Sequence, residues 1–131
     1  RRMPAGTRAP MRERPLTQMQ VAQAEGWLEA GRAYLFRSAD DIWRMGEAGA
    51  SFDNAARAAA RLASVTAAKL AAMATDIVHE ATGMNAVQAA SDLDRCWRDV
   101  HTITQHVVLS AGRYEVVGRI MLGLDPGAPI I

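Results

Sequence analysis

Residues with chemically versatile side chains are concentrated in one stretch of the chain, from Asp92 to His106. Two histidines, two arginines, three aspartates and a tryptophan occur there within fifteen residues. Polar chemistry gathered in one place is typical of a functional site. Such a set suits metal binding, nucleophilic catalysis or acid–base catalysis, and the spacing of the residues helps to separate these possibilities.

The spacing of His101 and His106 argues against a metal site. The two residues are five apart, so on one helix their side chains diverge by about 140 degrees. Histidine pairs that share a metal prefer a spacing of three or four. Cys96 is the only cysteine, which excludes an internal disulfide. The nearby negative charge of Asp99 disfavours a thiolate, so we expect a small buried thiol and not a nucleophile.

His106 is the candidate for acid–base catalysis. It follows a β-branched run and precedes another apolar segment, where it could line a cleft. Imidazole donates, accepts and changes charge near neutral pH. The residues alone leave a second interpretation open, namely a hydrogen-bonded structural histidine. His79 falls in the last turn of a predicted helix, where a cap or surface role is expected.

Trp97 and Arg98 each allow two interpretations. Arg98 either holds the phosphate or carboxylate of a ligand or pairs with Asp94 one helical turn away, and Arg95 and Asp99 have the same i, i+4 spacing. Trp97 belongs either to the core or to the surface beside a planar cofactor.

The elements around this stretch are alanine-rich helices. We predict helices over residues 16–48, 52–82, 92–101 or a little beyond, and 108–122. Ser51 and Ser91 are the expected N-caps of the second and third helices. The short Gly/Ser connection between the two long helices predicts that they pack antiparallel. The predicted fold class is therefore all-α, an antiparallel four-helix bundle.

The first long helix has apolar residues on more than one face. Its seam repeats every seven residues (Val21, Leu28, Leu35 and Ile42), and small residues such as Ala24 and Gly31 lie between them. Small residues let two helix axes approach closely. A second stripe carries Phe36 and Trp43. Such a helix is buried on more than one side, either through contact between copies of the chain or through tighter wrapping within one bundle.

Composition limits the class of protein. The chain has 131 residues, of which 50% are hydrophobic, and a net charge of +1. These values favour one domain with a core and argue against nucleic acid as a partner. No run approaches eighteen apolar residues, so we expect no membrane-spanning helix. Residues 1–14 are rich in arginine and proline and are predicted to be a disordered tail; residues 15–131 form the helical domain with an apolar C-terminal tail. Without the apolar stretch of a secretory peptide, a cytoplasmic location is expected.

A family resemblance is carried by Asp92-Leu93-Asp94-Arg95-Cys96-Trp97-Arg98-Asp99-Val100, then His106, Gly118-Arg119 and Asp125-Pro126-Gly127. This pattern resembles the C-terminal helical domain of the acyl-CoA dehydrogenase superfamily. The closer match is its monooxygenase branch, the oxygenase components of two-component flavin systems. Acyl-CoA dehydrogenases proper have a Gly-Gly pair upstream and a Glu-Gly-Thr run downstream, which residues 83–85 and 107–109 do not supply.

The resemblance implies a larger enzyme with an α-helical N-terminal domain, a β middle domain and this bundle, assembled as a tetramer. Such an enzyme takes reduced FMN or FAD from a separate reductase, and a flavin hydroperoxide hydroxylates a small-molecule substrate, often aromatic. The position of His106 implies a place in the flavin–substrate pocket, where it assists substrate deprotonation or stabilises the hydroperoxide. We predict Trp97 and Arg98 as cofactor contacts.

Without the flavin-holding domain, the bundle alone is expected to be inactive, since it cannot exclude water from that chemistry. Two alternatives stay open. The first is the same domain of an acyl-CoA dehydrogenase that oxidises an acyl thioester. The second is a non-catalytic helical oligomerisation module.

Overall fold

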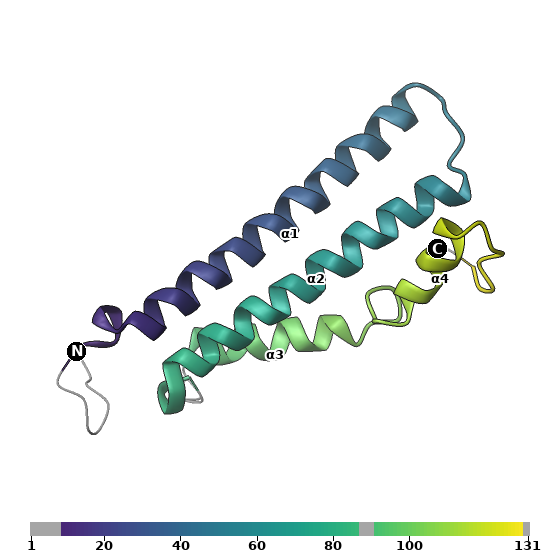
Figure 1. The fold of residues 1–131 in the computed structure, drawn as a ribbon. Coiled ribbons are helices and arrows are strands. Elements are labelled where there is room, and N and C mark those ends of the chain that lie inside the picture. Colours follow the sequence, from purple (N-terminus) through teal and green to yellow (C-terminus); the bar gives the residue numbers. More distant parts are fainter. Residues whose placement is uncertain (1–8, 87–90, 130–131) are drawn as a thin grey trace.

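The computed structural model describes residues 9–86 and 91–129. Within these ranges the chain is all-helical, as predicted. The helices are α1 (Pro15–Glu47), α2 (Asn54–Thr82), α3 (Asp92–Thr104) and α4 (Arg113–Met121), with 3-10 turns at Met11–Glu13 and Gly83–Asn85. The helices α1 and α2 run side by side in opposite directions, while α3 and α4 follow one another along α2 (Figure 1).

The ends of the two long helices follow from local chemistry. The helix α1 begins at Pro15, where the missing N–H costs nothing, and it ends just before Gly49, which has a φ of +65°. The start of α2 was predicted two residues early, because the expected cap Ser51 is not used. Asp53 is the N-cap, and its Oδ1 accepts a hydrogen bond of 2.8 Å from the Ala56 N–H.

Of the two C-terminal helices, α3 agrees with its prediction and α4 is shorter than predicted. The helix α3 continues three residues past His101, since the threonines at its end bond to backbone carbonyls one turn back; Thr102 Oγ1, for example, donates to the Arg98 carbonyl at 2.8 Å. The last helix begins at Arg113 and not at Val108, because residues 105–112 form a series of turns. Ser91 is the N-cap residue of α3, but its side chain makes no capping bond.

The contact between α1 and α2 depends on small residues. Gly31 and Ala24 are the buried residues of α1. A Cβ added to Gly31 would lie 3.3 Å from the Cα of Ala67 on α2, which leaves no room for a larger side chain without movement. The prediction that small residues allow close helix approach is thus confirmed at Gly31.

The bundle is open, with α2 at its centre. The backbone of α2 lies close to α1, α3 and α4, whereas the backbone of α1 lies close to neither α3 nor α4 in the described part of the chain. The second apolar face of α1 is therefore left uncovered in the single chain, and contact between copies of the chain stays a prediction. The predicted seam is also less buried than expected, because Leu28 and Leu35 remain 44% and 39% exposed. Both line an apolar groove of about 520 Å³ between α1 and α3.

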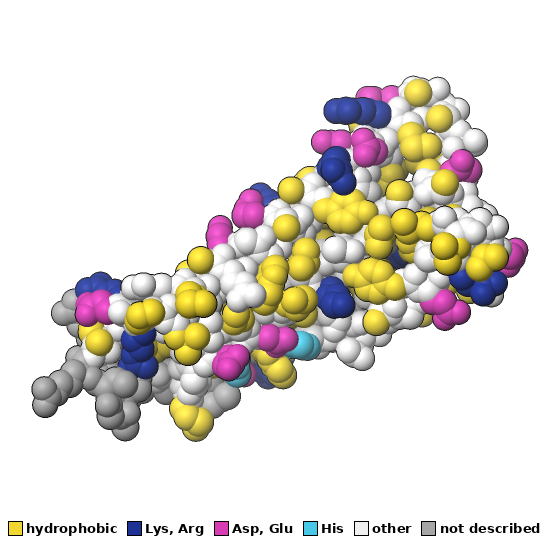
Figure 2. All heavy atoms as spheres, viewed as in Figure 1, with side chains coloured by type: hydrophobic (Ala, Val, Ile, Leu, Met, Phe, Trp, Pro, Cys, Tyr) yellow, Lys and Arg dark blue, Asp and Glu magenta, His cyan; other side chains and the backbone are white. Residues whose placement is uncertain are grey.

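Exposed apolar side chains continue along α1 beyond this groove. Trp43 is 71% exposed and Phe36 is 59% exposed. Figure 2 shows hydrophobic side chains spread over the surface on this face of the molecule. No helix among the described residues is long and apolar enough to span a bilayer.

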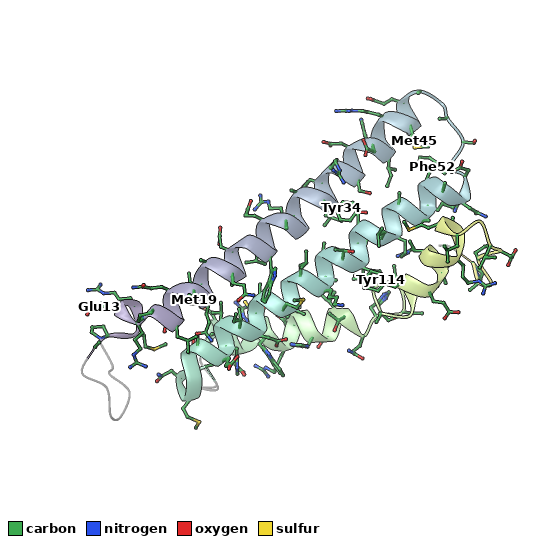
Figure 3. The ribbon with its side chains drawn as sticks, viewed as in Figure 1. Glu13, Met19, Tyr34, Met45, Phe52 and Tyr114 are labelled. Carbon is green, nitrogen blue, oxygen red and sulfur yellow. The ribbon has the colours of Figure 1, made fainter. Side chains whose placement is uncertain are left out.

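The helix α4 is held on α2 by mixed contacts. Tyr114 projects from α4 toward α2 (Figure 3), and its hydroxyl lies 3.3 Å from Thr66 Oγ1. Val117 is buried. After α4 the chain folds back, with the Arg119 side chain donating to the Asp125 carbonyl at 2.7 Å and the Gly127 N–H to Asp125 Oδ1 at 2.8 Å.

Three segments carry predictions that fall partly outside the described residues. Most of the arginine-rich tail, residues 1–8, is not described, and within its remainder Met11–Glu13 forms a 3-10 turn. The connector before α3 is described only up to Ala86. The last two residues of the apolar C-terminal tail are likewise not described.

Candidate functional site

Four side chains from α2 and α3 form a polar and aromatic cluster: Asp76, His79, Trp97 and His101. The Trp97 indole N–H donates to Asp76 Oδ1 at 2.7 Å, and His101 Nε2 lies 2.8 Å from the same oxygen. The Trp97 ring is 4.5 Å from the His101 ring and 5.4 Å from the His79 ring, measured between centroids. We call these four residues the Asp76 cluster.

Helical spacing explains why the cluster forms. Trp97 and His101 are four residues apart on α3 and share the face that meets α2, while Asp76 and His79 are three apart on the facing turn of α2. One carboxylate oxygen thereby orients two rings and ties the helices together. A carboxylate oxygen accepts hydrogen bonds, so the His101 Nε2 atom that contacts Asp76 is assigned as the protonated donor. The Nε2 atom of His79 is buried without a hydrogen-bond partner.

Arg98 lies on a different face of α3. Its side chain is 63% exposed, and its guanidinium forms an ion pair of 3.1 Å with Asp94, the predicted i, i+4 partner, whose side chain is 21% exposed. Arg95 does not pair with Asp99 as predicted, but with Asp92 at 3.2 Å, one turn toward the N-terminus. The carboxylates in the first turn of α3 also suit the positive end of the helix dipole. The outer face of α3 thus presents a solvated cation at Arg98.

His106 lies in the turns after α3 and is exposed. Its Nδ1 accepts a hydrogen bond of 3.3 Å from the Val108 N–H. Two arginines from other elements hold the same loop. Arg113 Nε donates to the Val107 carbonyl at 2.7 Å, and Arg61 Nη1 on α2 donates to the Val108 carbonyl at 3.0 Å. Burial, followed by the charge of Arg113, lowers the pKa of the Arg61 guanidinium below its ordinary value.

The three predicted site residues therefore occupy three different environments. Trp97 faces α2 within the Asp76 cluster, Arg98 faces solvent beside Asp94, and His106 projects from the loop. The structure brings Trp97 together with His101, a residue to which the sequence assigned no role. Cys96 is exposed, so the prediction of a buried thiol was wrong.

Sequence reasoning missed Asp76, Arg61 and Arg113. A signal existed for Asp76, since it is a lone carboxylate in the alanine-rich part of α2 and lies three residues before His79. No comparable signal marked the two arginines, because their partners are backbone carbonyls that any residue supplies. Within the described ranges, no group of three or more His, Cys, Asp or Glu side chains is placed to hold a metal ion.

Comparison with known proteins defines the class of this domain. Residues 1–111 match the family model described as acyl-CoA dehydrogenase, C-terminal domain. The chain belongs to this family, which confirms the resemblance inferred from the residues around Trp97 and His106.

Three relatives are named as monooxygenases or hydroxylases. Indole-3-acetate monooxygenase of Pseudomonas putida is 32% identical over 87% of this chain. Pigment production hydroxylase of Rhodococcus erythropolis is 31% identical over 92% of it. The oxygenase subunit HsaA of a flavin-dependent monooxygenase from Mycobacterium tuberculosis is 27% identical over 97% of it. The chain spans 29%, 31% and 32% of the lengths of these three proteins, respectively.

Proposed function

We propose that this chain is the C-terminal helical domain of the oxygenase component of a flavin-dependent monooxygenase that hydroxylates a small aromatic substrate. The observation that carries the proposal is the similarity over most of the chain to three relatives named as monooxygenases or hydroxylases, one of them flavin-dependent. The name of one relative, indole-3-acetate monooxygenase, supports an aromatic substrate.

The described residues suit one side of a flavin site. A flavin mononucleotide or dinucleotide has a phosphate, which fits the exposed guanidinium of Arg98. Trp97 is only partly buried, so part of its ring surface is left for a planar group, although its N–H is bonded to Asp76. The exposed imidazole of His106 suits a polar atom of the flavin or the substrate. When bound, a reduced flavin supplies the electrons that activate oxygen.

The site would be completed by protein beyond these helices. Arg98 and His106 are exposed, and catalysis of this kind needs a site closed to water. The family resemblance implies that other domains hold most of the flavin, FMN or FAD, and that a separate reductase reduces it. The exposed apolar residues of α1 support contact with further copies of the chain, and we propose a tetramer for the whole enzyme.

The test uses the protein produced from the complete reading frame, supplied with reductase-generated FMNH₂ or FADH₂ and oxygen. Aromatic acids and phenols are offered as substrates, and the products are analysed by mass spectrometry. A product with one added oxygen atom supports the proposal. Oxidation of an acyl-CoA with an electron acceptor, and no hydroxylation, would instead support an acyl-CoA dehydrogenase.

Replacement of His106 tests the proposed catalytic residue. His106→Ala should lower kcat for hydroxylation about 100-fold or more, the usual range for loss of a group that transfers a proton or stabilises a negatively charged oxygen. The oligomer should persist, since His106 lies in an exposed loop. Gln105→Ala, which changes the neighbouring exposed residue, is the matched control and should retain activity. Unchanged turnover in His106→Ala would reject the assignment.

A further inference from the structure

The loop between α3 and α4 holds His106 in one defined hydrogen-bonding arrangement. We propose that Arg113 and Arg61 are positioning residues for His106, and that they fix its neutral imidazole with the proton on Nε2. Both arginines act through the backbone, by donating to the carbonyls of Val107 and Val108. The catalytic meaning of this arrangement rests on the proposed function, whereas the arrangement itself does not.

The argument begins with the peptide group that joins Val107 to Val108. In a trans peptide the carbonyl and the N–H lie in one plane and point in opposite directions. Arg113 Nε donates to the Val107 carbonyl at 2.7 Å, so this contact sets the orientation of the plane. On the opposite side, the Val108 N–H then points at His106 Nδ1, 3.3 Å away.

The next peptide group, which joins Val108 to Leu109, is also held by an arginine, in this case from α2. Arg61 reaches from α2 to the Val108 carbonyl at 3.0 Å, a contact between residues 47 apart in sequence. The Arg61 guanidinium is partly withdrawn from water at this contact, and this burial, followed by the charge of Arg113, lowers its pKa. A hydrogen bond from a charged donor is stronger in such surroundings than in solvent. Two consecutive peptides are therefore anchored, one to α4 and one to α2.

The consequence for His106 follows from the chemistry of imidazole. A nitrogen that accepts a hydrogen bond has no proton, so the neutral ring must carry its proton on the other nitrogen. With Nδ1 accepting from the Val108 N–H, Nε2 is the protonated atom, and it is the one left to face a ligand. His106 then offers a hydrogen-bond donor to an oxygen atom. This arrangement suits stabilisation of a negatively charged oxygen better than removal of a proton.

Nuclear magnetic resonance of the chain with ¹⁵N-labelled histidine measures this arrangement directly. Above the pH at which His106 loses its charge, Nδ1 should have the chemical shift of an unprotonated nitrogen and Nε2 that of a protonated one. In Arg113→Leu the two shifts should move toward each other as the tautomers mix. Arg113→Lys, which keeps a cationic donor, should restore most of the difference.

Arg119→Leu is the matched control. Arg119 lies on the same helix and also donates to a loop carbonyl at 2.7 Å, but that carbonyl belongs to Asp125. The His106 shifts should not change in this variant, and circular dichroism should report the same helix content in all variants. A wild-type His106 with the proton on Nδ1, or an Arg113→Leu protein with unchanged shifts, would overturn the proposal. If Arg113→Leu does not fold, Arg61→Lys and Arg61→Met provide the same comparison.

Activity separates this inference from the proposed function. In the complete protein, Arg113→Leu should lower kcat by up to about 100-fold, with little change in KM, and should cause no further loss when His106 is already alanine. If the NMR result holds while His106→Ala and Arg113→Leu are both fully active, the proposed catalytic role fails and the positioning of His106 stands. An additional loss in the double variant would show that Arg113 acts by another route.

Discussion

Helix α1 and the segment from α3 to α4 are held to α2 by different interactions. The contact of α1 with α2 is made by small and apolar residues, with Gly31 and Ala24 buried in it. In contrast, α3 and the loop before α4 are attached to α2 through hydrogen bonds of Trp97 and Arg61, and Arg113 ties the same loop to α4. Packing of small residues sets the distance between two helices, whereas directional bonds set the orientation of particular side chains and peptides.

This difference has a consequence for function. Apolar packing is not directional, so it does not fix the orientation of an imidazole ring. The loop that carries His106 is anchored at two carbonyls, and the rings of Trp97 and His101 are anchored at one carboxylate oxygen. The side chains whose orientation is fixed by hydrogen bonds are therefore in the part of the domain that contains the candidate site. A preorganised site requires its functional side chains to be held in this way by their neighbours.

The largest effect is expected at the contact of α1 with α2. Gly31→Leu would place side-chain atoms where a Cβ alone already lies 3.3 Å from the Ala67 Cα. Overpacking of this kind costs about 1–3 kcal/mol of unfolding free energy. Urea unfolding followed by circular dichroism measures it. Gly26→Leu on the same helix is the control, because a Cβ there meets nothing within 4 Å; equal stability of the two variants would contradict close packing at Gly31.

The attachment of α3 should be the next most sensitive. Asp76→Ala removes the acceptor shared by Trp97 and His101. Each lost hydrogen bond costs about 0.5–1.5 kcal/mol, and the partial exposure of the carboxylate keeps the total near the lower end, about 1–2 kcal/mol. Thermal unfolding measures the change. Asp40→Ala, at an exposed position of α1, should be close to neutral, and an Asp76→Ala protein as stable as this control would mean that the shared oxygen does not hold α3.

A smaller effect is expected at the start of α2. Asp53→Ala removes the bond from Asp53 Oδ1 to the Ala56 N–H, a cap whose loss costs about 1 kcal/mol. Ser51→Ala, at the cap position that the sequence favoured, should leave the unfolding free energy within experimental error. A larger loss of unfolding free energy in Ser51→Ala than in Asp53→Ala would identify Ser51 as the N-cap instead. Urea midpoints at constant slope distinguish these outcomes.

The same contrast explains how much of the structure was predictable from the sequence. The long helices were predicted within two residues at each end, because heptad spacing, alanine content and the glycines after α1 all act locally. The start of α4 was wrong by five residues, since the turns before it are maintained by Arg61, which lies 47 residues away from Val108. The exposure of Leu28 and Leu35 could not be predicted, because a periodic pattern shows that a face is apolar and not what covers it.

For the candidate site, the sequence located the region but not the partners. Trp97, Arg98 and His106 were selected as residue types with suitable chemistry, yet each makes its contacts on a different side of α3 or beyond its end. Helical spacing within α3 predicted the Arg98–Asp94 pair correctly. The bond from Trp97 to Asp76 joins residues 21 apart across two helices, and spacing within one helix carries no information about it.

The smallest effect on stability is expected on the outer face of α3, where the exposed side chain of Arg98 pairs with the partly buried Asp94. Exposed pairs one helical turn apart contribute about 0.3–0.5 kcal/mol, so Arg98→Ala should barely change the unfolding free energy, and a double-mutant cycle with Asp94→Ala should give a coupling in that range. The flavin affinity of the complete protein should respond differently. If Arg98 binds the flavin phosphate, Arg98→Ala should weaken flavin binding and make it less sensitive to salt, because one charge-assisted contact is lost. The control Arg95→Ala, on the same helix, should change neither the affinity nor its salt dependence. Equal affinities and equal salt dependence in Arg98→Ala and the unmodified protein would remove Arg98 from the flavin site and leave it as a solvated surface charge.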